Sequence, residues 1–319
     1  MRFVIAIAGT FALFAGIARA DLLVSSRLSN EVLRYDDSSA FVGEFTMGGN
    51  IVTPNGLVIG ADGMLYLSSR DGGQILRFSG STGMFDKVFA QGPQMVGPSG
   101  LTFGPDGDLY VANSLADNVG RYDKSTGALV RTFGLPGTLS APIAAAFGDD
   151  GLMYVTSALN NRLVRYDPES GAEQIMVSGG LLAGPADIKR GPDGLLYIAN
   201  PNNNRVTRFS IATGTNNSFS QAGAVQFPVG LDFGPGGDLF VASFPTDAIV
   251  RLNVRTGASK GIYIPSGLGG LDGPQYLLFI PEPGSTSLLM LGATTVGLRR
   301  RHARFRSAAR SVGAATNGQ

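Results

Sequence analysis

Residues 97–113 read GPSGLTFGPDGDLYVAN, and the pattern of this segment indicates the fold class. The alternation of apolar residues over 98–103 predicts a strand, and 109–113 predict a second one. Between them lies Asp106-Gly107, a hairpin signal for which we expect a type I′ turn, with positive φ at both central positions. A second hairpin pattern follows over 119–133. The unit therefore contains four short strands.

This unit recurs along the whole chain. An Asp-Gly or Gly-Gly pair lies between two apolar runs at five places, spaced by 43 or 44 residues: 62–63, 106–107, 150–151, 193–194 and 236–237. An Arg followed by a large apolar residue recurs six times at the same spacing: Arg34, Arg77, Arg121, Arg165, Arg208 and Arg251. A four-stranded unit of this length has the size of a propeller blade.

The two ends of the repeat region complete each other. Residues 21–26 align with 108–113, so the first copy lacks its first strand, and residues 273–279 align with 97–103 and supply one. A blade split between the termini closes the ring and leaves no unpaired edge. The sequence therefore predicts an all-β fold, a six-bladed β-propeller with four-stranded blades, over residues 21–281.

The ring region is acidic, although the 319-residue chain has a net charge of +1. Residues 1–20 contain two Arg and no acid, and residues 282–319 contain six Arg and one Glu. Without these ends, 17 of 25 basic and 23 of 24 acidic residues remain, a net charge of about −6. An acidic body without a basic stripe predicts that the chain does not bind nucleic acid. The absence of Cys excludes disulfides and thiolate chemistry.

Residues 1–20 have the pattern of a secretory signal peptide. A basic start and an apolar run precede Ala18-Arg19-Ala20, a small-x-small cleavage site that would make Asp21 the first residue of the mature chain. The alternative for this segment is an N-terminal membrane anchor or buried helix. Cleavage implies signal peptidase as a partner and export across the cytoplasmic membrane.

Propeller connectivity assigns two faces to the ring. The Asp-Gly turns lie on one face, and loops rich in Asn and Ser lie on the other, where we expect binding residues. The first residues of the innermost strands are expected to ring the mouth of the central channel, with a polar set of Asn55, Ser99, Asp187, Asp232 and Gln275.

Two readings of this polar set stay open. Asn55, Asp187 and Asp232 could hold Ca²⁺ or another divalent cation through oxygen ligands. The other reading is a water-filled channel with satisfied polar groups and no cofactor. The repeated Arg also allows a ring of cations, but a residue in every blade is more simply a structural element whose head hydrogen-bonds a neighbouring loop.

Residues 281–301 form a second informative stretch. Pro281-Glu282-Pro283 precedes an apolar run of about 15 residues, and Arg299-Arg300-Arg301 follow it. This run is short for a full membrane span, yet Arg directly after it suits the cytoplasmic side of a membrane. We therefore expect a membrane helix here, with residues 302–319 as a basic disordered tail.

This C-terminal stretch resembles the PEP-CTERM sorting signal of Gram-negative bacteria, which has a Pro-Glu-Pro motif, an apolar helix and an Arg cluster in that order. The resemblance implies recognition by an exosortase and cleavage near Pro281-Glu282-Pro283. It also implies release or attachment at the cell surface, often in bacteria that make exopolysaccharide. Thr and Ser within the helix, and 18 residues after the Arg cluster, depart from the commonest form.

The ring resembles NHL-type propellers and their virginiamycin B lyase-like and gluconolactonase-like relatives, through residues 97–113 and Asn203-Asn204-Arg205-Val206. The lyase resemblance implies a channel His and a metal, but the only His is His302, outside the ring. The lactonase resemblance implies carboxylate and Asn ligands around a divalent cation, to which Asn55 and Asp187 correspond in part. Asp187 lies one position beyond the usual Pro-Asp-Gly pattern.

The sequence thus favours a non-catalytic propeller, exported and sorted to the bacterial envelope, as a binding or interaction scaffold. Its expected partners, besides the processing enzymes, are an envelope protein or an exopolysaccharide. The alternative is a divalent-metal-dependent lactonase with its site in the central channel.

Overall fold

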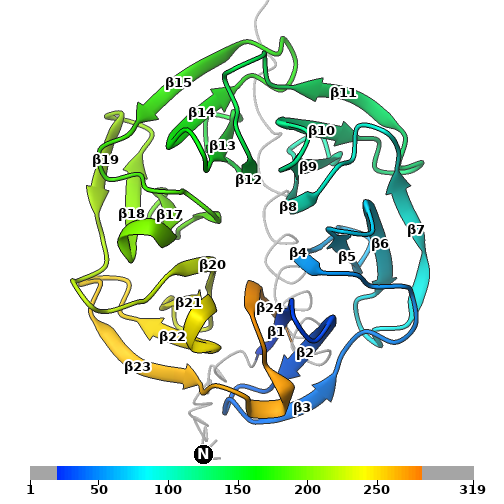
Figure 1. The fold of residues 1–319 in the computed structure, drawn as a ribbon, viewed down its shortest axis with the longest axis vertical. Helices are drawn as coiled ribbons and strands as arrows, with labels where there is room; N and C mark the ends of the chain where they lie inside the picture. Colours follow the sequence, from blue (N-terminus) through cyan, green and yellow to red (C-terminus); the bar gives the residue numbers. More distant parts are fainter. Residues whose placement is uncertain (1–19, 282–319) are drawn as a thin grey trace, which may run out of the picture. The chain divides into compact units, whose positions relative to one another are not determined.

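Six four-stranded antiparallel sheets surround one central axis in the computed structural model, which describes residues 20–281 (Figure 1). The predicted all-β six-bladed propeller is confirmed. We number blades 2 to 6 in chain order, and blade 1 is the one that both ends of the fold build.

Each blade contributes one strand to each of four concentric layers. The innermost strands are β4 (Pro54–Ile59), β8 (Pro98–Phe103), β12 (Pro142–Phe147), β16 (Ile188–Arg190), β20 (Pro228–Phe233) and β24 (Pro274–Pro281). The second strands are β5 (Met64–Ser69), β9 (Leu109–Asn113), β13 (Met153–Ser157), β17 (Leu196–Asn200), β21 (Leu239–Ser243) and β1 (Ala20–Ser26).

The two outer layers follow the same order. The third strands are β6 (Gln74–Ser79), β10 (Asn118–Tyr122), β14 (Arg162–Tyr166), β18 (Arg205–Ser210), β22 (Ala248–Leu252) and β2 (Glu31–Tyr35). The outermost are β7 (Phe85–Gln91), β11 (Leu129–Phe133), β15 (Glu173–Ser178), β19 (Thr215–Ser218), β23 (Ser259–Ile264) and β3 (Phe41–Glu44). Three short 3₁₀ turns occur in loops: η1 (Pro201–Asn203), η2 (Phe244–Thr246) and η3 (Leu268–Gly270).

Blade 1 closes the ring as the sequence predicts. Its strand order is β24-β1-β2-β3, so a C-terminal strand lies innermost beside the first strand of the fold. The pairing runs from Ala20 opposite Pro281 to Val24 opposite Leu277 and then shifts at a bulge. Because both edges of the repeat region are used in this one sheet, no innermost strand lacks a partner within residues 20–281.

The core lies between neighbouring blades. The second strands are covered on both sides, and β9, β13, β17 and β21 are buried along their whole length. One cluster joins Leu23 of blade 1 to Leu57 and Leu67 of blade 2, and its counterparts recur around the ring. Packing between sheets thus replaces disulfides as the source of stability.

The Asp-Gly turns differ from the predicted type I′ geometry. The Gly107 N–H donates to the Gly104 carbonyl at 2.9 Å, so Pro105 and Asp106 are the central residues and Gly107 follows with φ of 83°. Pro favours the negative φ of the first central position, and Gly then adopts the left-handed conformation that ends a longer hairpin loop. The type I′ prediction was wrong because it placed Asp106 at positive φ.

The Asp of this turn has a structural partner in the next strand. In blade 3 the Tyr110 hydroxyl donates to Asp106 Oδ2 at 2.8 Å, while Asp106 Oδ1 accepts the Asp108 N–H at 3.0 Å. Blades 2, 4 and 5 repeat the Tyr–Asp bond at 2.7 to 2.9 Å. Blade 6 lacks both partners, because Gly236 replaces the Asp and Phe240 replaces the Tyr.

The repeated Arg residues also lie within this framework. Four of them bond carboxylates of their own blade at 2.6 to 2.8 Å, and the other two contact Gln174 or the ring of Phe219: Arg34–Asp21, Arg77–Asp86, Arg121–Asp108, Arg251–Asp238, Arg165–Gln174 and Arg208–Phe219. These contacts account for the Arg repeat as a structural element.

A short polar side chain ties most blades to the next one. In five blades an Asn or Asp with φ of 45° to 61°, just before the third strand, accepts a backbone N–H from the next blade. The donor is the residue before the Pro that begins the next inner strand or, in blade 5, shortly precedes it. We call this contact the latch, and its five examples span 2.7 to 2.8 Å: Asn30–Thr53, Asp117–Ala141, Asn161–Gly184, Asn204–Phe227 and Asp247–Gly273. Blade 2 has Gly73 at this place, so the latch to Gly97 is missing.

Candidate functional site

The narrow end of the central channel is set by one level of residues near the start of the inner strands. The strand registers place Leu57, Leu101, Ala145, Ile188, Leu231 and Leu277 at equivalent positions. The residues just before them form this level: Gly56, Gly100, Ala144, Asp187, Gly230 and Tyr276. A Cβ added to Gly230 would lie 1.9 Å from the Gln275 carbonyl oxygen, and one on Gly56 would lie 2.5 Å from the Ser99 carbonyl oxygen. The inner strands therefore approach so closely that only Gly fits at these places.

Tyr276 closes this narrow end. Its hydroxyl crosses from β24 to donate to the Ile143 carbonyl of β12 at 3.1 Å, and these strands lie on opposite sides of the ring (Figure 1). A Cβ on Gly100 would lie 2.6 Å from the Tyr276 hydroxyl oxygen, so the small residues leave the room that the one aromatic ring fills. Burial holds the pKa of the Tyr276 hydroxyl well above its usual range, so it stays a proton donor.

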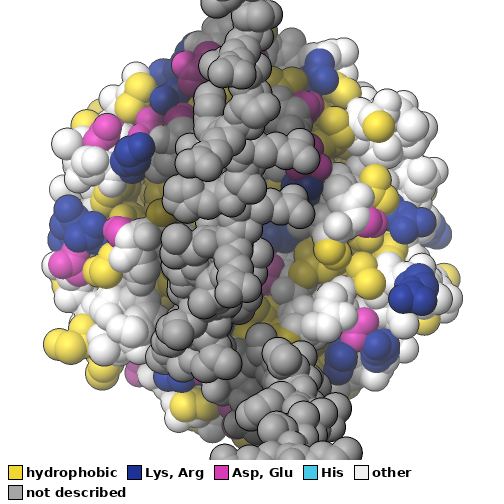
Figure 2. Space-filling view, turned by 180° about the vertical axis from the view of Figure 1, so that it is seen from behind, with side chains coloured by type: hydrophobic (Ala, Val, Ile, Leu, Met, Phe, Trp, Pro, Cys, Tyr) yellow, Lys and Arg dark blue, Asp and Glu magenta, His cyan; other side chains and the backbone are white. Residues whose placement is uncertain are grey.

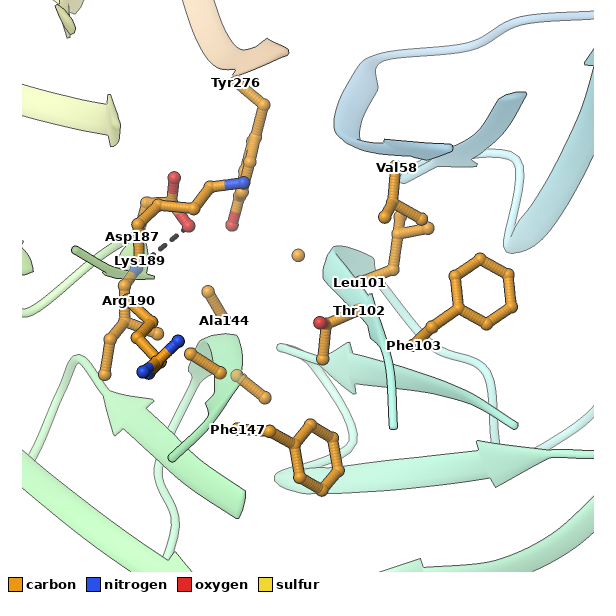
Figure 3. Close-up of a pocket in the computed structure, with 14 residues that line it drawn as sticks. Val58, Leu101, Thr102, Phe103, Ala144, Phe147, Asp187, Lys189, Arg190 and Tyr276 are labelled. Atoms are coloured by element: carbon orange, nitrogen blue, oxygen red, sulfur yellow. Dashed lines mark hydrogen bonds between the residues drawn. The ribbon is translucent and has the colours of Figure 1, made fainter. Parts of the chain in front are cut away.

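A cavity of about 270 Å³ lies inside the channel, next to Tyr276 and on the side away from the closed end. Its lining is divided, as Figure 3 shows: Asp187, Lys189 and Arg190 stand on one side, and Val58, Leu101 and Phe103 stand opposite. Thr102, Phe147 and the Ala residues of β12 complete the wall. Arg190, at the end of β16, is 42% exposed in its side chain and pairs with Asp149. The cavity therefore opens toward the face of the Asp-Gly turns.

Two carboxylates at the channel are bound to the backbone of neighbouring blades. Asp187 Oδ2 accepts the Leu231 N–H of blade 6 at 2.9 Å, and its Oδ1 accepts the Ile188 N–H at 2.9 Å. Asp232 Oδ2 accepts the Phe279 N–H of blade 1 at 2.8 Å. Both side chains thus join adjacent inner strands. Burial raises the pKa of Asp187 to about 6 and also raises the pKa of Asp232.

The Lys189 ammonium is a positive charge that interacts with Asp187 and Asp232. Burial alone would lower the pKa of this ammonium, but Asp187 and Asp232 outweigh that effect and raise it. The amine is therefore protonated at neutral pH and is unsuited to act as a nucleophile. The ammonium interacts with both carboxylates through space but makes no hydrogen bond or close ion pair within residues 20–281.

This donor set does not fit the divalent cation considered for the channel. Ca²⁺ takes six to eight oxygen ligands, whereas both oxygens of Asp187 and one of Asp232 already accept N–H groups. The Lys189 ammonium would also repel a metal ion near these carboxylates. Across residues 20–281 no group of three or more His, Cys, Asp or Glu side chains is suited to hold a metal.

The structure separates the three residues of the predicted channel site. Asp187 and Asp232 interact with each other and with Lys189. Asn55 is on β4, in the blade opposite β16, and does not line the cavity (Figure 1). Asn55 is 5% exposed, and its Oδ1 has no hydrogen-bond partner within the described residues.

The expected channel mouth lies at the other end. Ser99 and Gln275, like Asn55 and Asp187, are buried at the end that Tyr276 closes, so they do not ring an opening. Sequence reasoning missed Lys189 and Tyr276. A signal for Tyr276 exists, because it is the one large residue at a level where the other five copies have Gly, Ala or Asp.

The processing residues lie mostly outside the described part. Ala20 and Asp21 begin β1, and Asp21 is buried against Arg34. Pro281 ends β24. Ala18, Glu282, Pro283 and Arg299 to Arg301 lie outside the described residues, as does the expected C-terminal helix. Among residues 20–281, no helix has the length and apolar character needed to cross a membrane.

Comparison with known proteins places these features in a family. A profile of the virginiamycin B lyase family matches residues 22–265. A catalytically inactive His-to-Ala variant of the virginiamycin B lyase from Staphylococcus aureus, with quinupristin, is 20% identical, with a TM-score of 0.63 over 84% of this chain and 94% of that one. No curated protein matches the sequence.

Two other solved structures show how widely this fold is shared. A chain of the nidogen/laminin complex is 13% identical, with a TM-score of 0.70 over 82% of this chain and 99% of that one. A gluconolactonase from Xanthomonas campestris, XC5397, is 15% identical, with a TM-score of 0.60 over 81% and 89%. At such identities the likeness concerns the fold alone.

Proposed function

Because the chain belongs to the virginiamycin B lyase family, we propose that it is a non-catalytic member, a binding scaffold exported to the bacterial envelope. In the S. aureus relative, one His-to-Ala change gives a catalytically inactive protein. This chain has a single His, His302, and none in the ring. A family catalyst that depends on imidazole therefore has no counterpart among the ring residues.

The observation that carries the proposal is the state of the two channel carboxylates. Asp187 and Asp232 accept backbone N–H groups of neighbouring blades, and both interact electrostatically with the Lys189 ammonium. These hydrogen bonds join neighbouring inner strands, so the two carboxylates have a structural role. The same cavity still offers a rigid, partly polar space to a ligand.

The test is an activity assay on the purified chain with quinupristin and with aldonolactones, each with and without Mg²⁺, Ca²⁺, Mn²⁺ or Zn²⁺. We expect the conversion rate to equal that of the heat-denatured chain. Saturable conversion that is lost in Asp187→Asn would contradict the proposal.

One observation favours a lactonase as the second candidate. Asp187 borders a cavity, and a carboxyl with a pKa of about 6 is suited to general base catalysis. The same assay separates the two functions, because a lactonase would convert an aldonolactone at a rate that rises with pH through that value.

Export to the envelope is supported by where the fold starts and stops. Its first and last strands pair from Ala20 to Pro281, so cleavage after Ala20 and near Pro281 would leave four strands in every blade. The proposed partners are signal peptidase, an exosortase-type enzyme, the cytoplasmic membrane before processing, and an envelope protein or exopolysaccharide afterwards. Intact-mass measurement of the exported chain tests this, and retention of Arg299–Gln319 would contradict it.

The proposal excludes nucleic acid as a partner. Acidic and basic side chains are interspersed over the uncovered part of the face in Figure 2, without a continuous stripe of Lys and Arg. A backbone-binding surface needs such a stripe.

A further inference from the structure

We propose that the cavity beneath Tyr276 is a binding site for a neutral, monosaccharide-sized polyol, held by Lys189 and Thr102. This rests on the proposed function, since it names the ligand class for the same channel. The cavity is closed at one end and open at the other, which gives a ligand one way in. Its volume of about 270 Å³ equals that of about nine water molecules, which suits one sugar ring.

The charges of the cavity select against charged ligands. Asp187 and Asp232 face the single cation Lys189, while the Arg190 guanidinium is already paired with Asp149. An anion bound at Lys189 would also meet two carboxylates. A cation would meet the ammonium, and three of the four carboxylate oxygens that could attract it already accept backbone N–H groups. A neutral ligand avoids both costs.

The polar groups that lack partners define what the ligand must offer. The Lys189 ammonium lines the cavity without a hydrogen bond, and the Thr102 hydroxyl lines it without a partner in the described chain. The first is a donor only, and the second is a donor and an acceptor. One hydroxyl of a ligand can accept from Lys189, and another can bond Thr102, across the cavity in Figure 3, in either direction.

The opposite wall suits the apolar side of a sugar. Val58 and Leu101 stand across from the charged side chains, as Figure 3 shows. The rings of Phe103 and Phe147 point away from the cavity and pack on Tyr66 and Tyr110. A sugar ring has hydroxyls at its edge and C–H groups on its faces, so one molecule satisfies both walls. The divided lining therefore points to a cyclic polyol.

The test is titration calorimetry and saturation-transfer NMR on the full chain, with glucose, galactose and mannose as neutral probes. Glucuronate and glucosamine are the charged counterparts of nearly the same shape. We expect at least one neutral sugar to bind, and its charged counterpart to bind at least tenfold more weakly. A charged sugar that binds more tightly than the neutral one, or no binding of any sugar, would overturn the proposal.

Matched variants locate the binding. Lys189→Met and Thr102→Val should each weaken it at least fivefold, and the second keeps the shape and charge of the cavity if the first fails to fold. Lys87→Met is the control, because Lys87 is exposed on the outermost strand β7. Binding that is unchanged in Thr102→Val and in a folded Lys189→Met would place the sugar elsewhere and refute the site.

The same NMR samples keep the two proposals distinct. Chemical conversion of a bound sugar or its lactone would refute the non-catalytic function while leaving the site in place. Absence of binding would refute the site and leave the question of catalysis to the activity assay.

Discussion

The missing latch between blades 2 and 3 gives a prediction about stability. Five blade junctions have an Asn or Asp side chain that accepts an N–H of the next blade, and Gly73 interrupts the series. Gly73 has φ of 63°, close to the 45° to 61° of the five latch residues. Asn tolerates this conformation, so Gly73→Asn should place its Oδ1 near the Gly97 N–H.

The structure allows the size of the effect to be worked out. A Cβ on Gly73 would meet only the Met95 carbonyl oxygen at 3.4 Å, an ordinary contact. One new side chain-to-backbone hydrogen bond contributes about 1 kcal/mol. Replacing Gly lowers the conformational entropy of the unfolded chain, which raises the free energy of unfolding by at most about 1 kcal/mol. The strain of Asn in the left-handed conformation lowers it by a similar amount. The net gain is therefore about 1 kcal/mol, or about 2–4 °C in Tm for a ring of this size.

The assay is urea and thermal unfolding followed by circular dichroism. Gly73→Ala is the first control, since it adds the same Cβ without an acceptor and should lower the free energy of unfolding by about 1 kcal/mol. Asp117→Gly is the second, because it recreates the Gly73 arrangement at an intact latch and should cost about 1 kcal/mol or more. A Gly73→Asn variant no more stable than Gly73→Ala would refute the reasoning.

Two further predictions concern the turns and the channel. Tyr110→Phe removes a 2.8 Å bond to Asp106 and should cost about 1 kcal/mol in the parent chain but little in an Asp106→Ala background, where that bond is already absent. Asp106→Ala alone should cost more, because Asp106 also accepts the Asp108 N–H and pairs with Arg121; urea unfolding of the single and double variants measures both costs. Burial raises the pKa of Asp187 to about 6, so between about pH 4 and 6 the folded chain keeps a proton there that the unfolded chain releases. The contribution of Asp187 to the free energy of unfolding therefore falls by about 3 kcal/mol as the pH rises through that window. Stability curves at pH 4 to 7 should therefore fall more steeply for the parent chain than for Asp187→Asn, and parallel curves would contradict this account.

Repeat spacing was sufficient to predict the architecture. The spacings of 43 and 44 residues and the matching ends at 21–26 and 273–279 predicted six blades and their closure through β24 and β1. Blade 5 departs from the repeat, because the other five inner strands begin at a Pro, whereas β16 begins at Ile188, three residues after Pro185. The Asp187 N–H donates to Val229 of β20, so this segment bonds the neighbouring blade before its own strand starts.

The candidate site could not be predicted in full, because it is formed by contacts between blades that the repeat spacing does not reveal. Asp187, Lys189 and Asp232 come from two different blades, and only their shared position on the inner strands brings their charges together. The closed end of the channel depended on one side chain, Tyr276, that reaches the opposite blade. The expected mouth was therefore placed at the wrong end, and the resident cation was overlooked.

The channel carboxylates join neighbouring inner strands and interact with Lys189, from which we infer that they hold no catalytic metal. Thermal unfolding of the purified chain in titrations with Ca²⁺, Mg²⁺, Mn²⁺ and Zn²⁺ tests this, because a metal that binds only the native state must raise the Tm. We expect no saturable rise in Tm with any of these ions. A rise that saturates at micromolar metal, and that Asp187→Asn abolishes, would contradict it.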